Sequence, residues 1–351
     1  MIFFWLCFGC TRISEKNLFK FPVETIPDIG YTDTLSPVSV LANADLIEFN
    51  VVEKSIISYM LTGPDYLSVT PVDGEKATFG LCRKGRGPGE FISMAPSFDY
   101  DDGHLNLMDA HLGKYYSLNL KESLDSAKTI IDKSCTLPWT YDRFNPILAA
   151  FSIGKDSLLV YQTVVENSFG RGDSNRPIYV LLKLSTSEVV KQYDCFGRVP
   201  SHSRTEMLLD TQQLLHVWHC MNTERNRLCF AMLRTPQINI MDIHTGFTRG
   251  FRLDGRPRLN RNRMYLYFLS VCSHENFIYA LYSGDEGMNP SSTPLSPATL
   301  YVFDWEGRIH EKYLLDAPYQ RCVVTADGIY LSKWEDNSGM GLYFVPWNFV
   351  R

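Results

Sequence analysis

The sequence lacks the short motifs that identify common enzyme classes. Residues 85–89 are rich in glycine, but no Lys-Ser or Lys-Thr pair follows them, so they do not form a phosphate-binding P-loop. No dinucleotide fingerprint or serine nucleophile motif is present. No His-Glu or paired-carboxylate arrangement has the spacing of a zinc or calcium site. We therefore expect no catalytic residue, no metal and no cofactor.

An excess of positive charge is also missing. The chain has 34 Lys and Arg against 39 Asp and Glu, which gives a formal net charge of -5 over 351 residues. Because a nucleic-acid-binding surface usually makes its domain strongly basic, no nucleic-acid partner is expected. The contents of 45% apolar and 21% charged residues are typical of a globular protein and argue against disorder.

The cysteines and histidines lack the spacing of ligand pairs. Apart from Cys7 and Cys10, the cysteines are scattered, with no C-x-x-C pair among them, which excludes zinc-ribbon and thioredoxin-like chemistry. Most lie in strand-like runs, so we expect small buried side chains. His216 and His219 could suggest a metal pair. In a strand, however, residues three apart point to opposite faces, so no metal site is expected there.

The first ten residues form an apolar run that is too short to span a bilayer and ends in Gly9 and Cys10. This run resembles the end of a bacterial lipoprotein signal, in which Cys10 would be lipidated and would hold the protein to a membrane. A buried strand or a plain secretory signal are the alternatives. Residues 11–34 are polar with Pro22 and Pro27, and this composition predicts a tether.

Short strand patterns repeat along the rest of the chain, and the aromatic content of the whole sequence, 13%, favours strands. The first apolar residue after successive tight turns recurs at intervals of roughly 50 residues, the period of a four-stranded propeller blade. These residues are Ile56, Leu105, Leu158, Leu228, Phe277 and Ile329. The pattern predicts one all-β domain over residues 35–351, a six-bladed β-propeller of four-stranded antiparallel blades. The last unit ends without its fourth strand, so we expect residues 35–42 to supply it and close the ring.

A glycine-proline corner separates the first two units. Three glycines permit positive φ and a proline fixes its own φ, so the chain must change direction here, and an apolar environment is expected for the phenylalanine that follows. The corner consists of Gly85, Gly87, Pro88, Gly89, Glu90 and Phe91. With the lipoprotein-like N-terminus and the Asp-Gly-x-Leu type strands that follow, it resembles the TolB-like six-bladed propeller lipoproteins of Gram-negative bacteria. The resemblance implies a cell-envelope propeller, in a group most of whose members have no assigned activity.

The loop lengths suggest where a ligand binds. Because the four strands a, b, c and d of a blade alternate in direction, turns a–b and c–d lie on one face of the ring, and loops b–c and connections d–a lie on the other. The sequence predicts that all a–b and c–d turns are short. The long insertions all fall on the opposite face, which predicts a binding surface there. They are residues 85–91, 166–177, 196–214, 254–263 and 284–297.

The fourth of these insertions is rich in arginine, and guanidinium groups pair bidentately with oxyanions. A run of this kind is usually a solvated connector, and the functional alternative is a site for an anionic ligand such as an acidic glycan or a phosphate. The candidate ligand-binding residues are Arg256, Arg258, Arg261, Arg263, Tyr265 and Tyr267. An Arg-Gly-Asp tripeptide at residues 171–173 is better explained as a turn than as an adhesion motif.

The sequence thus favours a monomeric, non-enzymatic envelope protein that binds an envelope protein or a glycan and touches the membrane through its lipid anchor only. The alternative is a glycan-active or lactone-hydrolysing propeller enzyme with a metal on the ring axis. That alternative requires carboxylates and an asparagine that converge on the axis from the inner strands. Asp99 and Glu48 are the visible candidates.

Overall fold

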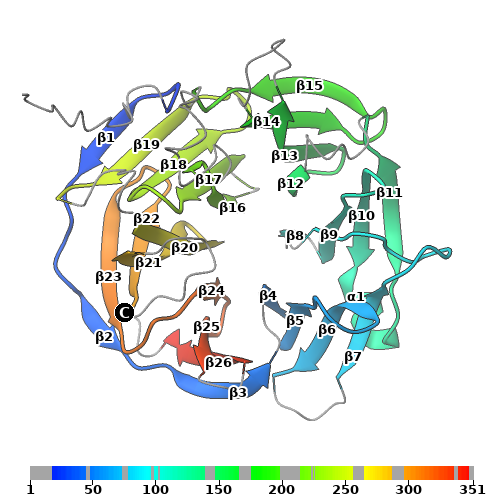
Figure 1. Cartoon of the computed structure of the whole chain (residues 1–351), viewed down its shortest axis with the longest axis horizontal. Coiled ribbons are helices and arrows are strands. Elements are labelled where there is room, and N and C mark those ends of the chain that lie inside the picture. Colours follow the sequence, from blue (N-terminus) through cyan, green and yellow to red (C-terminus); the bar gives the residue numbers. More distant parts are fainter. Residues whose placement is uncertain are drawn as a thin grey trace, which may run out of the picture.

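The computed structural model describes residues 18–44, 48–72, 78–95, 99–101, 103–138, 147–165, 175–197, 214–222, 224, 226–255, 265–286, 296–335 and 339–347. These residues form six sheets arranged in a ring around a central axis (Figure 1). In each sheet, four strands follow one another antiparallel from the axis outward. The predicted all-β, six-bladed propeller is confirmed.

In blades 1 to 3, the strands follow the chain from the inner to the outer edge of the ring. Blade 1 holds β4 (Phe49–Val52), β5 (Ser55–Tyr59), β6 (Asp65–Pro71) and β7 (Phe79–Arg83). Blade 2 holds β8 (Asp99–Asp101), β9 (His104–Asp109), β10 (Lys114–Asn119) and β11 (Ile131–Thr136), with helix α1 (Leu120–Ser126) between the last two. Blade 3 holds β12 (Ile147–Ile153), β13 (Ser157–Val165), β14 (Asn175–Lys183) and β15 (Glu188–Tyr193).

Blades 4 to 6 follow the same order. Blade 4 holds β16 (Val217–Asn222), β17 (Arg227–Met232), β18 (Gln237–Asp242) and β19 (Thr248–Leu253). Blade 5 holds β20 (Tyr265–His274), β21 (Phe277–Glu286), β22 (Thr299–Asp304) and β23 (Ile309–Leu315). Blade 6 holds β24 (Arg321–Val324), β25 (Gly328–Glu335), β26 (Gly339–Pro346) and, from the other end of the chain, β3 (Val38–Ala44).

All six residues that marked the repeat lie in the second strand of a blade. These strands are covered on both sides by neighbouring blades, so their apolar residues run without the usual alternation. In β17, for example, Leu228 to Met232 are all buried. The resulting core consists of apolar clusters between adjacent sheets, as where blades 1 and 2 bury Leu67, Phe91 and Leu105 together.

The ring is closed by the N-terminal strand, as predicted. Strand β3 pairs antiparallel with β26, with Val38 opposite Phe344 and Leu41 opposite Leu342. Blade 6 is thereby completed by a segment that leads on into blade 1. This pairing covers an edge of β26 that would otherwise present unpaired backbone groups.

Residues 18–34 differ from the predicted tether, because they lie along the outside of blades 3 to 5. Strand β1 (Val23–Ile26) pairs parallel with β19, and β2 (Asp33–Leu35) pairs parallel with β23 (Figure 1). Asp28 lies between these two strands in the chain. Its carboxylate is 2.8 Å from Nζ of the buried Lys312 and also accepts a hydrogen bond from the Tyr301 hydroxyl. The prolines that suggested a linker lie at the ends of β1, where no backbone N–H is needed. Residues 11–17 are outside the described residues.

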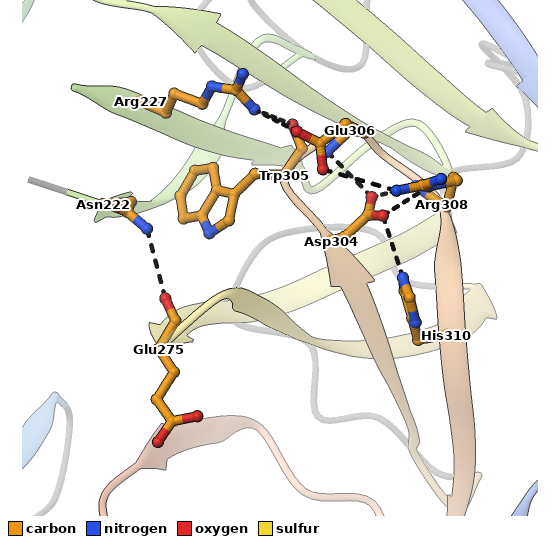
Figure 2. A network of polar contacts seen from close by, with 8 residues as sticks. All are labelled: Asn222, Arg227, Glu275, Asp304, Trp305, Glu306, Arg308 and His310. Atoms are coloured by element: carbon orange, nitrogen blue, oxygen red, sulfur yellow. Dashed lines mark hydrogen bonds and ion pairs between the residues drawn. The ribbon is translucent and has the colours of Figure 1, made fainter. Parts of the chain in front are cut away.

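The a–b and c–d turns form a face, the short-turn face, on which adjacent blades are joined. Arg227 of blade 4 donates to the Trp305 carbonyl at 2.8 Å and to Glu306 at 2.9 Å in the c–d turn of blade 5 (Figure 2). The same turn is held by Asp304, whose carboxylate accepts from Arg308 at 2.7 Å. Gly307 has φ +84, and a Cβ there would lie 2.4 Å from the Phe251 ring of blade 4. This turn therefore requires glycine.

The prediction that all turns on this face are short is wrong in blade 2. Helix α1 lies in the c–d connection between β10 and β11. Asn119 caps the helix by accepting from the Glu122 backbone N–H, and Ala127 ends it in the left-handed conformation. The helix also packs locally, since Leu120 N donates to the carbonyl of Gly103 in the adjacent a–b turn. Loop length is thus biased toward the opposite face but not confined to it.

Closure can be tested by truncation. Deleting residues 18–42 should abolish the single cooperative thermal transition, because blade 6 loses its outer strand and blades 4 and 5 lose their parallel edge strands. The measurement is a melt followed by near-ultraviolet circular dichroism. Deleting residues 11–17 serves as the control and should leave the transition unchanged. A protein lacking residues 18–42 that melts as sharply and at the same temperature as the parent would contradict this account of closure.

Candidate functional site

The hub of the ring is organised by Arg321, the first residue of β24 in blade 6. Its Nε donates to Glu48 Oε1 of blade 1 at 2.8 Å, and its Nη1 donates to the Leu269 carbonyl of blade 5 at 2.8 Å. Its guanidinium also lies over the indole ring of Trp218 in blade 4, 4.0 Å from the ring centroid. One side chain can contact three other blades only where the inner strands converge, so Arg321 lies at the ring axis.

Two more residues extend this site within blade 4. His216 immediately precedes β16, and its ring lies 4.9 Å from the Trp218 ring in a T-shaped arrangement. Arg234 lies in the turn between β17 and β18 and donates to the Tyr265 carbonyl at 3.4 Å. We call Glu48, His216, Trp218, Arg234 and Arg321 the hub cluster.

The hub cluster lies toward one face of the ring. Inner strands begin on the face of the b–c loops and d–a connections, which we call the long-loop face. Glu48 and His216 immediately precede β4 and β16, and Arg321 begins β24. Arg234 is in a b–c turn, which belongs to the same face. The cluster is therefore at the mouth of the axis on the long-loop face.

Burial shapes the charges of the hub cluster. It raises the pKa of Glu48, against which the charge and hydrogen bond of Arg321 act. Burial, together with the charges of Arg321 and Arg234, lowers the pKa of His216 to about 4. His216 is therefore neutral at pH 7. Arg321 is paired with Glu48, and the guanidinium group of Arg234 lies in the same cluster.

The long-loop half of the ring also holds buried polar atoms for which no described residue provides a hydrogen-bond partner. They are His216 Nε2, Trp218 Nε1, Thr235 Oγ1, Gln162 Oε1, Thr163 Oγ1 and Ser332 Oγ. Such atoms are rare in folded proteins, because each costs about 1–3 kcal/mol when it is left without a partner. Trp218 Nε1 can only donate, and it belongs to the ring that Arg321 covers. The arrangement suits a ligand that accepts hydrogen bonds.

The predicted ligand-binding residues fall into two groups. Tyr265 lies at the hub, since its carbonyl accepts from Arg234. Tyr267 is buried within blade 5, with its ring 5.8 Å from Tyr265 and 5.9 Å from Tyr282. It therefore has a core position. The four predicted arginines, Arg256, Arg258, Arg261 and Arg263, lie outside the described residues, as does Cys10.

The glycine-proline corner is a structural turn that is held by hydrogen bonds among its own residues. The Gly87 backbone N–H donates to Glu90 Oε2 at 2.7 Å, and the Gly85 N–H donates to the Phe91 carbonyl at 3.0 Å. Phe91 is buried between blades 1 and 2. Gly89 has φ +76, and a Cβ on Gly85 would lie 1.9 Å from Glu90 Oε2. The Glu90 carboxylate therefore occupies the space that the missing side chain leaves.

The two carboxylates that could have marked an axial metal do not converge. Asp99 Oδ2 accepts from the Ser152 backbone N–H of blade 3 at 2.6 Å and from Asn106 at 2.9 Å, so it joins blades 2 and 3. Glu48 is paired with Arg321 instead. In the part of the chain that the structure describes, no group of three or more His, Cys, Asp or Glu side chains could hold a metal ion. The enzyme alternative gains no support from these residues.

His216 and His219 also have separate environments. His219 Nε2 lies 3.0 Å from the Tyr179 hydroxyl, and its ring contacts those of Phe151 and Tyr161. Burial among these rings lowers the pKa of His219 to about 3, and His216 contributes in the same direction. His219 is thus a core histidine between blades 3 and 4, whereas His216 belongs to the hub.

The sequence did not identify Trp218, Arg234 or Arg321 as site residues. A tryptophan in an apolar strand and an arginine at the start of a strand are ordinary features, and neither belongs to a motif. Two signals were present but weak: Trp218 lies between two histidines, and Arg234 interrupts a run of apolar residues at a turn.

Comparison with known proteins gives a fold and no family. No family model matches the chain, and no curated protein matches it. A member of the DUF4221 family from Bacteroides vulgatus has a TM-score of 0.58 at 10% identity, over 89% of this chain and 96% of that one. A Bacteroides fragilis protein described as exported has a TM-score of 0.49 at 12% identity, over 92% of this chain and 99% of that one. At 10% identity, the first similarity shows a shared fold alone.

Within the described residues, no helix is long and apolar enough to cross a membrane.

The environment of Asp99 predicts a pH-dependent stability. Burial raises the pKa of Asp99 from 3.8 to about 7. The folded protein therefore retains this proton between these two values, while the unfolded chain loses it, and stability falls as the pH rises through this window. Asp99→Asn keeps the shape and cannot ionise. Relative to the parent, its free energy of unfolding should rise by up to about 1.4 kcal/mol per pH unit between pH 4.5 and 7.

The measurement is urea unfolding of both proteins at several pH values, with Asp125→Asn, which replaces an exposed carboxylate of α1, as the control. A difference between Asp99→Asn and the parent that stays constant from pH 4.5 to 7 would show that Asp99 is not held protonated.

Proposed function

We propose that this protein is a non-enzymatic cell-envelope propeller that binds an anionic ligand or partner at the hub cluster on its long-loop face. The observation that carries the proposal is the placement of Trp218. Its indole N–H is buried without a described acceptor, while Arg321 covers the same ring at 4.0 Å. A donor and a fixed cation in contact form a ready recognition element for an oxyanion.

The geometry also favours an anion over a neutral or cationic ligand. Arg321 is held in one orientation by Glu48 and by the carbonyls of Leu269 and Gln320, so little side-chain entropy remains to be lost on binding. Arg234 adds a second guanidinium, and neutral His216 supplies a ring nitrogen that can donate or accept. Carboxylated or phosphorylated glycans, and acidic protein segments, present such groups.

The arginine-rich connection between β19 and β20 extends this proposal. Asp254 and Tyr265 flank it, and the Tyr265 carbonyl is bonded to Arg234 of the hub cluster. We include Arg256, Arg258, Arg261 and Arg263 as the outer cationic part of the binding surface. Their charges would attract an anion to the face on which the hub cluster lies.

The cell-envelope location rests on the N-terminal sequence. The apolar run that ends at Cys10 resembles a lipoprotein signal, and the resemblance to TolB-like propeller lipoproteins supports the same location. A lipid on Cys10 would anchor the protein to the membrane. The segment that follows the anchor includes residues 18–35, which pair with the outer strands of blades 4 and 5. We propose a monomer.

Binding should depend on the indole N–H of Trp218. Trp218→Phe removes this donor and keeps an aromatic ring for Arg321, so the affinity for an anionic ligand should fall roughly tenfold, the usual value of a hydrogen bond to a charged group. The probes are a glycan array with oligogalacturonate and phosphorylated glycans, and an envelope pull-down. Trp305→Phe is the matched control, because Trp305 has a buried indole N–H without a described partner on the short-turn face.

The same assay separates the two faces by charge. Reversing the four arginines to glutamate should weaken binding by more than tenfold. Reversing four exposed lysines of the short-turn face should not, although the total charge changes equally; these are Lys54, Lys121, Lys128 and Lys155. Equal losses from both sets, or equal losses from Trp218→Phe and Trp305→Phe, would contradict binding at the long-loop face.

Lipidation gives a separate prediction. Cys10→Ala should move the protein from the membrane fraction to the soluble fraction, because the thioether that carries the acyl chains can no longer form. Fractionation followed by immunoblotting measures this, and Cys7→Ala is the control that should leave the distribution unchanged. If Cys10→Ala stays in the membrane fraction, the protein is not held there by a lipid on Cys10.

A further inference from the structure

Two cysteines from neighbouring blades touch each other near the axis. Cys272 lies on β20 of blade 5 and Cys322 on β24 of blade 6, and their Sγ atoms are 3.7 Å apart. The two strands are joined at this point, since the Cys322 backbone N–H donates to Ser270 Oγ at 3.2 Å and Ser270 Oγ lies 3.5 Å from the Cys322 carbonyl. The side chains thus face each other across a fixed contact between blades.

This geometry is close to that of a disulfide. A disulfide needs the two sulfurs about 2.0 Å apart, so the pair must close a gap of about 1.7 Å from its 3.7 Å separation. Rotation of the two side chains with a small backbone shift can supply that movement. We propose that Cys272 and Cys322 form a disulfide that covalently joins blades 5 and 6 when the protein resides in an oxidising compartment.

The chemistry is thiol–disulfide exchange with an external disulfide, either a small molecule or an oxidoreductase. Cys272 is partly exposed, whereas Cys322 is buried. The Cys272 thiol loses its proton and attacks one sulfur of the reagent, which releases the first reagent thiol. The Cys322 sulfur then attacks Cys272 in the mixed disulfide and releases the second thiol. Two protein thiols are oxidised, and one reagent disulfide is reduced to two thiols.

The surroundings of the pair favour the second step. The pKa of Cys322 is lowered by the hydrogen bond from Cys272, by Ser270 and by the charge of the adjacent Arg321. A sulfur with thiolate character is the better nucleophile for resolving the mixed disulfide. The hydrogen bond to Cys322 and burial raise the pKa of Cys272.

The remaining cysteines provide the alternative disulfides and the control for the test of this proposal. Cys220 and Cys229 are directly opposite on β16 and β17, but they belong to one blade, so a link between them would not join blades. Cys135 is partly exposed on the outer strand β11, far from the axis (Figure 1). Cys135 therefore serves as the control thiol.

The experiment uses the full chain, purified reduced and then incubated with oxidised glutathione. Free thiols are trapped with an alkylating reagent at low pH, and linked peptides are identified by mass spectrometry. The expected result is a peptide pair joined through Cys272 and Cys322. The oxidised protein should also melt roughly 5 °C above its reduced form, because the cross-link restricts the unfolded chain. Cys272→Ser should lose this shift, and Cys135→Ser should keep it.

The inference fails if Cys272 and Cys322 are both recovered as alkylated thiols from oxidised, folded protein, or if either is linked to another cysteine. Peptide mapping of the parent chain decides this even where a substituted protein does not fold. The inference is independent of the proposed ligand, because the disulfide forms between blades 5 and 6 whether or not Trp218 binds an anion.

Discussion

Closure of the ring is the constraint on which the rest of the structure depends. A blade of four strands has an open edge and two apolar faces, and six of them are stable together because each covers its neighbours. The circle is completed only where β3 pairs with β26, so that the last blade is finished by the segment that starts the first. Glu48 and Arg321 face each other across the same seam, 2.8 Å apart. Closure thereby places a charged pair at the axis.

The two faces of the closed ring then take different roles. On the short-turn face, polar side chains are used between blades, as Arg227 is on the turn that contains Trp305 and Glu306 (Figure 2). On the long-loop face, Arg321 is also bonded between blades, but buried groups such as Trp218 Nε1 and His216 Nε2 have no partner among the described residues. Among the described residues, several such groups gather on the long-loop face, whereas Trp305 Nε1 is the one on the short-turn face. Because leaving such groups without partners is costly, the chemistry of the long-loop face suits a ligand better.

Much of the fold could be predicted from the sequence because it depends on local signals. Ile56, Leu105 and their counterparts follow tight turns and start buried second strands, so the period of the blades is visible without a structure. The position of residues 18–34 could not be predicted in the same way. Strand β1 pairs with β19, far away in the chain, and its side chains are half exposed, so its composition resembles that of a linker.

The hub cluster could not be predicted from the sequence for the same reason. Glu48 and Arg321 are separated by 273 positions, and only ring closure brings them together. Asp99 and Glu48 were singled out as inner-strand carboxylates; Asp99 lies in β8, and Glu48 immediately precedes β4. Their partners, Ser152 and Arg321, decide that they hold blades together instead of sharing a ligand on the axis. Which residues pair across such large separations in the sequence is decided by closure of the ring.

The most direct test of the central claim is a nuclear magnetic resonance titration of the tryptophan indole N–H groups with oligogalacturonate and, separately, with inorganic phosphate. Trp218 and Trp305 are the matched reporters, since both are buried without a described acceptor and lie on opposite faces. The account predicts that the Trp218 signal shifts in a saturable manner while the Trp305 signal stays in place. A bound ligand that shifts Trp305 and leaves Trp218 unchanged would contradict it.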